Sequence, residues 1–117
     1  MSTWRWAVVE ASLSEGIGSE QKGTRPVLVV SNEEFNQAMT NVTVLPMTST
    51  KRHLYPAEVL LPQKKAGQPM ESIVMAHQVR TISKRRLGRI HGYLSDPELQ
   101  RKVVEAIKDH FDIGREG

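Results

Sequence analysis

Short runs of β-branched and other apolar residues alternate with polar segments rich in glycine and proline over most of the chain. Runs of this kind are typical of strands in a half-buried sheet. The connection from Leu13 to Thr24 is too long for a tight hairpin, and long loops inside small domains are often functional. Pro46 is expected to end the third strand. The pattern predicts strands over residues 4–10, 25–31, 42–46, 55–61, 72–82 and 87–94.

Two capping boxes predict where helices begin. Ser31 stands three residues before Glu34, which predicts a short helical turn after the second strand. Ser95 stands three residues before Glu98, and Pro97 occupies the first turn that this box predicts. The second box should begin a longer helix near the end of the chain.

The apolar residues of this last segment recur at a helical spacing. Leu99, Val103, Ile107 and Phe111 are four residues apart, so they should form one face of an amphipathic helix. A face of this kind usually packs on the core. The chain therefore predicts a mainly β fold, a small curled or barrel-like sheet with a C-terminal α-helix packed on it.

The size and composition fit one globular domain, residues 1–117. Of the 117 residues, 38% are hydrophobic and 25% are charged, as in ordinary globular proteins. The sequence contains no apolar run long enough to span a membrane and no signal-peptide layout at its N-terminus. It has no cysteine, which suits a reducing compartment. We therefore expect a cytoplasmic protein with no membrane association.

Positive charge is concentrated in the second half of the chain. The formal net charge is +3, and residues 59–117 hold 11 of the 16 Lys and Arg residues. The densest part runs from Arg80 to Arg89. Such a cluster attracts polyanions, although it could equally be a solvated charged turn.

Arg25 lies where the glycine-rich connection meets the second strand. Pro26 holds Arg25 in an extended conformation and has no N–H, which suits the start of a strand. A guanidinium on stiff backbone can donate in pairs to phosphate oxygens. Arg25 is thus a candidate phosphate ligand, and the alternative is a surface charge at a strand start.

The sequence lacks the residues that several kinds of catalytic or metal site require. The four histidines are not at metal-ligand spacing, and the sequence has no zinc or calcium motif, no P-loop and no GxSxG element. Catalysis would therefore rely on Arg, Lys, Glu, His and hydroxyl groups, without a metal or cofactor. This set suits RNA cleavage, because RNA supplies its own 2′-hydroxyl nucleophile next to each phosphate.

A series of motifs carries a resemblance to a known family. The motifs are Gly18-Ser-Glu-Gln21, Arg25-Pro-Val-Leu-Val-Val-Ser31, Phe35-Asn36, Leu45-Pro-Met-Thr-Ser49, Gln78-Val-Arg-Thr-Ile82 and Arg86-Leu87. Their order and spacing resemble the MazF/PemK family of toxin endoribonucleases over nearly the whole chain. The resemblance implies an SH3-like barrel of the CcdB/MazF/PemK type and a homodimer. It also implies metal-independent cleavage of single-stranded RNA and neutralisation by a cognate antitoxin.

The resemblance also implies roles for single residues. Arg25 and Thr48 match the family's catalytic pair, although Thr48 could simply be a turn hydroxyl. Glu20 would be a general base or an orienting carboxylate, or else a solvated loop charge. The further positions expected to contact RNA are Ser19, Gln21, Ser49, His77, Gln78, Arg80 and Arg86.

The chain departs from the family pattern at two places. Trp4-Arg-Trp6 stands where the family often has a basic residue, glycine and an acid, which bears on dimer packing and RNA docking. His77 stands where an acidic residue is common. It could act as an acid or base near neutral pH, or it could be a structural histidine. Gln78 could contact a base or be an amide on the strand surface.

Two other functions compete with RNA cleavage. A CcdB-type toxin shares the barrel but poisons gyrase by binding protein, which does not require Arg25 and Thr48. A plain SH3-like interaction module would need an exposed aromatic groove, and the aromatic residues here are scattered. Incubation with RNA in excess EDTA would separate the enzyme from both alternatives.

Overall fold

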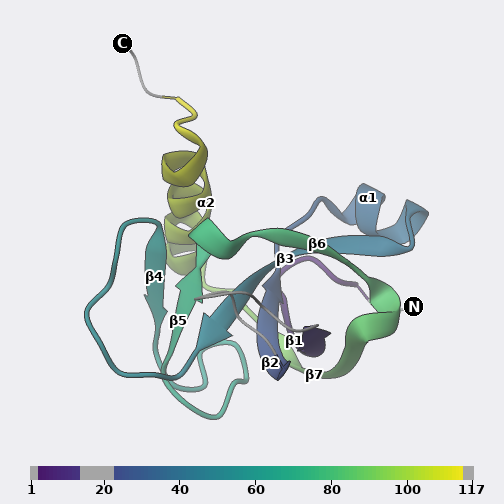
Figure 1. Cartoon of the computed structure of the whole chain (residues 1–117), viewed down its shortest axis with the longest axis horizontal. Coiled ribbons are helices and arrows are strands. Elements are labelled where there is room, and N and C mark those ends of the chain that lie inside the picture. The colour runs from purple at the N-terminus through teal and green to yellow at the C-terminus, as the bar shows by residue number, and fades with distance from the viewer. Residues whose placement is uncertain (1–2, 14–22, 115–117) are drawn as a thin grey trace.

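The computed structural model describes residues 3–13 and 23–114, which form a curled antiparallel sheet with a long helix packed against it (Figure 1). The prediction of a mainly β fold with a C-terminal helix is confirmed. The elements are β1 (Ala7–Leu13), β2 (Gly23–Val29), α1 (Glu33–Ala38), β3 (Asn41–Thr48), β4 (Glu58–Leu61), β5 (Ser72–Met75), η1 (Ala76–Gln78), β6 (Arg80–Ser83), η2 (Lys84–Arg86), β7 (Leu87–Tyr93) and α2 (Pro97–Phe111).

The strands of the described residues follow the order β4-β5-β3-β2-β1-β7, and β6 pairs with β3 beside this path. Strands β1 and β2 form a long antiparallel pair in which Val9 lies opposite Val27. The first strand was expected over residues 4–10 but begins at Ala7. Trp6 has a positive φ of 69°, in a turn that leads into the strand.

Strand β3 has different partners along its length. Its first half, Asn41–Val44, pairs with β6, whereas Met47 and Thr48 pair with β5. Pro46 lies between these two stretches, so its missing N–H is lost from neither of those ladders. The expectation that Pro46 would end the strand is therefore wrong.

The strand predicted over residues 72–82 is broken in the middle by η1. Met47 pairs with Val74, and Val44 pairs with Arg80, so the register along β3 slips by three residues between the two stretches. Those three residues are the 3-10 turn Ala76–Gln78. This insertion lifts His77 and Gln78 out of the sheet.

Both faces of the central strands are buried. Val8, Leu28 and Leu45 face one apolar cluster, which α2, β4 and β5 complete. Val9 and Val27 face a second cluster, which β6 and β7 complete. This two-sided burial explains why these strands read as continuous apolar runs rather than alternating ones.

Asparagine and aspartate begin the two α-helices. The Oδ1 atom of Asn32 accepts the backbone N–H of Glu34 at 2.7 Å, and Asp96 accepts that of Glu98 at 2.9 Å. The predicted caps, Ser31 and Ser95, are therefore each one residue too early. The Oγ atom of Ser31 accepts the backbone N–H of Thr43 instead, at 2.9 Å.

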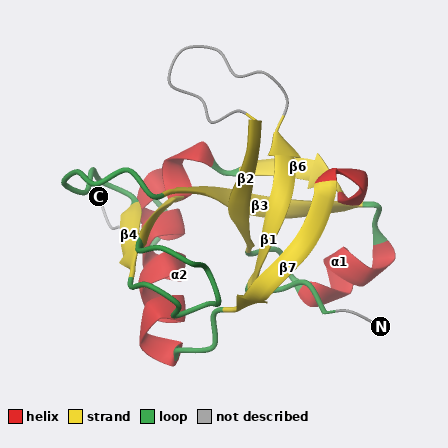
Figure 2. Ribbon diagram, turned by 90° about the horizontal axis from the view of Figure 1, so that it is seen from below, coloured by secondary structure: helices red, strands yellow, loops and turns green. Residues whose placement is uncertain are grey.

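The two α-helices lie at different ends of the sheet in both views (Figure 2). Helix α2 lies beside β4 and buries Leu99, Val103 and Ala106. Phe111 was expected on this apolar face, but it is 53% exposed in the last turn. Within the described ranges, no helix has both the length and the apolar character that crossing a membrane requires.

Candidate active site

The half-buried Arg25 is the third residue of β2. It pairs with Ala11 of β1. On the other side, β2 pairs with β3, with Val27 opposite Pro46. Continuing that register by two residues sets Arg25 opposite Thr48. The two predicted catalytic residues thus come from adjacent strand ends.

Thr48 is the last residue of β3 and is buried to 6% exposure. Its Oγ1 atom accepts the backbone N–H of Thr50 at 3.2 Å and donates to the Oγ1 atom of Thr50 at 3.1 Å. These bonds hold the hydroxyl at the strand end. To donate to a substrate oxygen, it would exchange only its bond to the Thr50 hydroxyl.

A cavity of about 170 Å³ lies beside Arg25, and we call it the Arg25 cavity. Ser49, which follows Thr48, also lines it. Its other lining residues come from β1, the start of β2, the end of β3, the segment before β5, the first residue of β5, and β7. They are Glu10, Pro26, Met47, Gln68, Pro69, Met70, Ser72 and His91.

Glu10 and His91 bring an acid and an imidazole into this cavity. The Nε2 atom of His91 lies 3.5 Å from the Oε2 atom of Glu10. That oxygen is buried and accepts no hydrogen bond from the described part of the chain. Neither residue was predicted from the sequence. The signal available was the lone carboxylate of Glu10 within the apolar run of the first strand.

The wall of the cavity formed by residues 66–70 is held by a close backbone contact. A Cβ atom on Gly92 would lie 2.6 Å from the carbonyl oxygen of Ala66, and one on Gly67 would lie 2.3 Å from that of His91. Gly67 also has a φ of +86°, which glycine adopts without strain. The buried amide of Gln68 donates to the carbonyl of Pro62 at 2.8 Å. These contacts fix the wall opposite Arg25.

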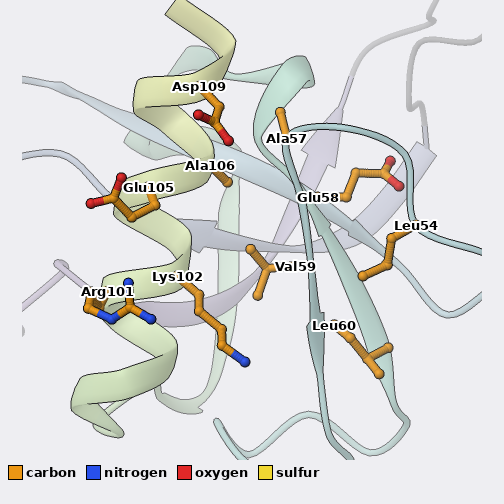
Figure 3. A pocket seen from close by; sticks show the side chains of 10 residues that line it. All are labelled: Leu54, Ala57, Glu58, Val59, Leu60, Arg101, Lys102, Glu105, Ala106 and Asp109. Atoms are coloured by element: carbon orange, nitrogen blue, oxygen red, sulfur yellow. The ribbon is translucent and has the colours of Figure 1, made fainter. Parts of the chain in front are cut away.

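His77 lies away from this cavity, in a charged network around Glu58. Its Nε2 atom is 2.7 Å from Glu58 Oε2, and Arg52 donates two N–H groups to the same carboxylate at 2.8 and 2.9 Å. The backbone N–H of Tyr55 adds a fourth donor at 2.8 Å. Figure 3 shows Glu58 turned away from α2.

Burial acts most strongly on the pKa of Glu58 and raises it. The hydrogen bonds from Arg52, His77 and Tyr55, together with the positive charge of Arg52, outweigh burial and lower the pKa to about 2. Glu58 is therefore ionised at neutral pH although its side chain is fully buried. It fixes the segment that leads from Ser49 into β4.

The remaining predicted RNA contacts fall into two groups. His77, Gln78 and Arg80 line one shallow hollow on η1 and β6. Arg86 donates to the carbonyl oxygen of Ser12 at 3.3 Å, and Ser12 pairs with Thr24, the neighbour of Arg25. The structure thus brings Arg86 to the same end of the sheet as Arg25. The predicted residues Ser19, Glu20 and Gln21 lie outside the described residues.

A metal site and a second hollow are weaker candidates for the active site than the Arg25 cavity. Among the described residues, no group of three or more His, Asp or Glu side chains could hold a metal ion. A further hollow lies between β4 and α2 (Figure 3). There Arg101 pairs with Glu98 of its own helix at 2.5 Å, so its guanidinium is already engaged within α2.

Comparison with known proteins identifies the family. The family model described as "PemK-like, MazF-like toxin of type II toxin-antitoxin system" matches residues 4–111. The chain belongs to this PemK/MazF toxin family. It is 35% identical over 114 residues to endoribonuclease MazF9 of Mycobacterium tuberculosis (strain ATCC 25618 / H37Rv), an alignment that covers 93% of this chain and 96% of MazF9.

Solved structures of PemK/MazF toxins have the same fold. Toxin MazF-mt6 of Mycobacterium tuberculosis superposes with a TM-score of 0.73 at 30% identity, over 92% of this chain and 99% of that one. An endoribonuclease from a mycobacterial species, solved with its cognate antitoxin, superposes with a TM-score of 0.75 at 24% identity, over 98% and 100%. The resemblance seen in the sequence and the predicted small barrel of the MazF type are both confirmed.

Proposed function

We propose that this chain is the toxin of a type II toxin–antitoxin pair and cleaves single-stranded RNA. The observation that supports the proposal is the Arg25 cavity, which Arg25 lines together with Met47 and Ser49, the two neighbours of Thr48. Family membership supports RNA cleavage over the gyrase-poisoning alternative, because its relative MazF9 is named an endoribonuclease.

The reaction is a transesterification within the RNA. The 2′-oxygen attacks the adjacent phosphorus, its proton passes to a base, and the 5′-oxygen leaves with a proton. Arg25 donates to the non-bridging oxygens as charge builds on them, and Thr48 donates to the same phosphate. Glu20 is the proposed acceptor of the 2′-hydroxyl proton, or else it orients Arg25. The products are a 2′,3′-cyclic phosphate and a 5′-hydroxyl, and no metal takes part.

RNA reaches this site across a basic surface. Arg86 lies near Arg25, whereas His77, Gln78 and Arg80 form a second contact region. Affinity should fall steeply with salt, because neutralised phosphates release counterions. If an Arg25→Ala variant bound RNA equally well at low and moderate salt, this description of the surface would be wrong.

The assembly is proposed on the same basis. The chain is a single toxin domain over residues 1–117, acts as a cytoplasmic homodimer, and is neutralised by an antitoxin whose acidic or extended segment occupies the RNA surface. Its relative solved with a cognate antitoxin supports this partner. Light scattering at micromolar concentration tests the dimer, and a stable monomer would contradict it.

The decisive experiment is cleavage of a single-stranded RNA in excess EDTA. Wild-type protein should cut it, whereas Arg25→Ala should be slower by about a hundredfold to a thousandfold, because a transition-state donor is lost. Thr48→Ala should lose somewhat less. Arg101→Ala, which breaks an exposed ion pair on α2, is the matched control and should cleave normally.

A 2′-deoxy substitution at the scissile nucleotide should abolish cutting, because it removes the nucleophile. Efficient cutting of that RNA, or a strict need for Mg²⁺, would show that water attacks instead and would overturn the mechanism.

A further inference from the structure

The Arg25 cavity has apolar walls and a polar end. Pro26 and Met47 come from β2 and β3, and Pro69 and Met70 come from the wall held by the Gly67 and Gly92 contacts. Proline rings and methionine side chains offer broad apolar surfaces against which a planar ring can pack. The cavity therefore suits a flat heterocycle with polar edges.

Its size limits what can enter. The volume of about 170 Å³ is below the ~300 Å³ at which pockets for drug-sized ligands begin. A cavity of this size suits a single base rather than a whole nucleotide, and Arg25 lines it.

Glu10 decides which kind of base fits. Its Oε2 atom is buried and accepts no hydrogen bond from the described residues, although buried acceptors in proteins usually have a donor. His91 lies at 3.5 Å, within ion-pair range but too far for a normal hydrogen bond. The carboxylate is therefore able to accept an N–H from a ligand in the cavity.

We propose that the Arg25 cavity binds one base next to the scissile phosphate, and that Glu10 selects a base with an exocyclic amino group. This inference rests on the proposed RNA cleavage. A carboxylate accepts from such an amino group, as Glu and Asp accept from N4 of cytosine. Uracil presents its O4 acceptor at the same place, so two acceptors would face each other. His91, on the neighbouring strand, lies within ion-pair range of the carboxylate but leaves this oxygen without a hydrogen bond from the described residues.

The first experiment reads the sequence around each cut. Wild-type protein is incubated with a randomised single-stranded RNA, and the new 5′-hydroxyl ends are sequenced. One position beside the cut should favour an amino-bearing base over uracil by about tenfold or more, as expected for a hydrogen bond to a charged acceptor.

Glu10→Gln should reduce this preference to below about threefold, because the amide can also donate to O4 of uracil. Cleavage of the best RNA should stay within about tenfold of wild type. Glu34→Gln is the matched control, since Glu34 is exposed on α1, and it should keep the full preference.

A second experiment uses wild-type protein, so it does not depend on how the variant folds. An RNA in which cytosine at that position is replaced by the same ring without its amino group should be cut about tenfold more slowly. In Glu10→Gln protein, the same replacement should change the rate less than in wild type, by about threefold or less, because the amide oxygen still accepts from the amino group but makes a weaker hydrogen bond than the carboxylate does.

The outcomes separate the two proposals. If wild-type protein cuts no RNA, the proposed function fails. If it cuts RNA but no position distinguishes amino-bearing bases from uracil, the base site is wrong while RNA cleavage stands. A preference that Glu10→Gln leaves unchanged would also overturn the role of Glu10.

Discussion

Replacing Glu58 with glutamine should test how much the buried charged network contributes to stability. The carboxylate accepts from Arg52, His77 and the backbone N–H of Tyr55, and its side chain is fully buried. A glutamine keeps one acceptor oxygen but turns an NH₂ group towards these donors. One or more N–H groups would then lose their acceptor inside the protein, which is the costly case for a buried pair.

The expected loss of stability follows from the pKa of Glu58. A fall from the ordinary value of 4.5 to about 2 corresponds to about 3 kcal/mol at ~1.36 kcal/mol per pKa unit. Because the pKa is lowered on folding, this stability is present above about pH 4.5 and is lost as the pH falls towards 2. Glu58→Gln should therefore cost about 3 kcal/mol at pH 7, and the difference from wild type should shrink in acid.

Urea unfolding followed by circular dichroism at pH 7, 5, 4 and 3 measures this difference. The pKa of Glu33 is also about 2, so both proteins should weaken in acid, and only the difference between them reports on Glu58. Glu98→Gln, in an exposed ion pair, is the control and should change stability by less than ~1 kcal/mol. A cost below 1 kcal/mol at pH 7, or the same cost at every pH, would refute the reasoning.

Two further substitution pairs test the fold around the site. Gly92→Ala should destabilise the protein by about 1–3 kcal/mol, because its Cβ would meet the backbone oxygen of Ala66, whereas Gly88→Ala has no neighbour within 3.8 Å and should change little. Equal melting temperatures for the two variants would contradict the close contact. Asp96→Ala should cost about 1 kcal/mol by removing the cap of α2, and Ser95→Ala should cost less. If urea unfolding showed a larger loss of stability for Ser95→Ala than for Asp96→Ala, Ser95 would be the cap of α2, as the sequence suggested.

The strands and the long helix could be predicted because their apolar runs are local signals. The break between β5 and β6 could not, because both strands follow the same edge of β3 and the sequence from Ser72 to Ile82 contains no Gly or Pro to mark a break. Its cause is the three-residue slip between the Met47–Val74 and Val44–Arg80 pairs, which exists only once the strands are paired. Phe111 shares the helical spacing of the buried residues but is the last residue of α2 and is exposed.

The capping residues of the two helices also could not be predicted from the sequence, although the choice was between immediate neighbours. In each case two neighbouring residues could have capped the helix, and the sequence favoured the earlier one. Ser31 is not available because its hydroxyl accepts the N–H of Thr43 and donates to Asn36. Tertiary contacts therefore decided between two side chains of similar capping ability.

Residues of the site could be predicted from the sequence only where they belong to a motif. Arg25 and Thr48 belong to recognisable segments, which lie on the paired strands β2 and β3. Glu10 and His91 belong to no motif and lie far apart in the sequence, so the pairing of β1 with β7 is needed to reveal them. The partners of His77 are likewise known only from the folded chain.

The burial of both faces of β1, β2 and β3 determines how the site would be lost on unfolding. If α2 detached together with β4 and β5, the other face of the central strands would remain packed against β6 and β7. Amide hydrogens in β2 would then exchange with solvent only when the whole domain opens, whereas those of α2 would exchange by local opening. Arg25 on β2 thus belongs to the last cooperative unit, whereas Thr48 pairs with Ile73 of β5 and would lose that neighbour in the partial opening.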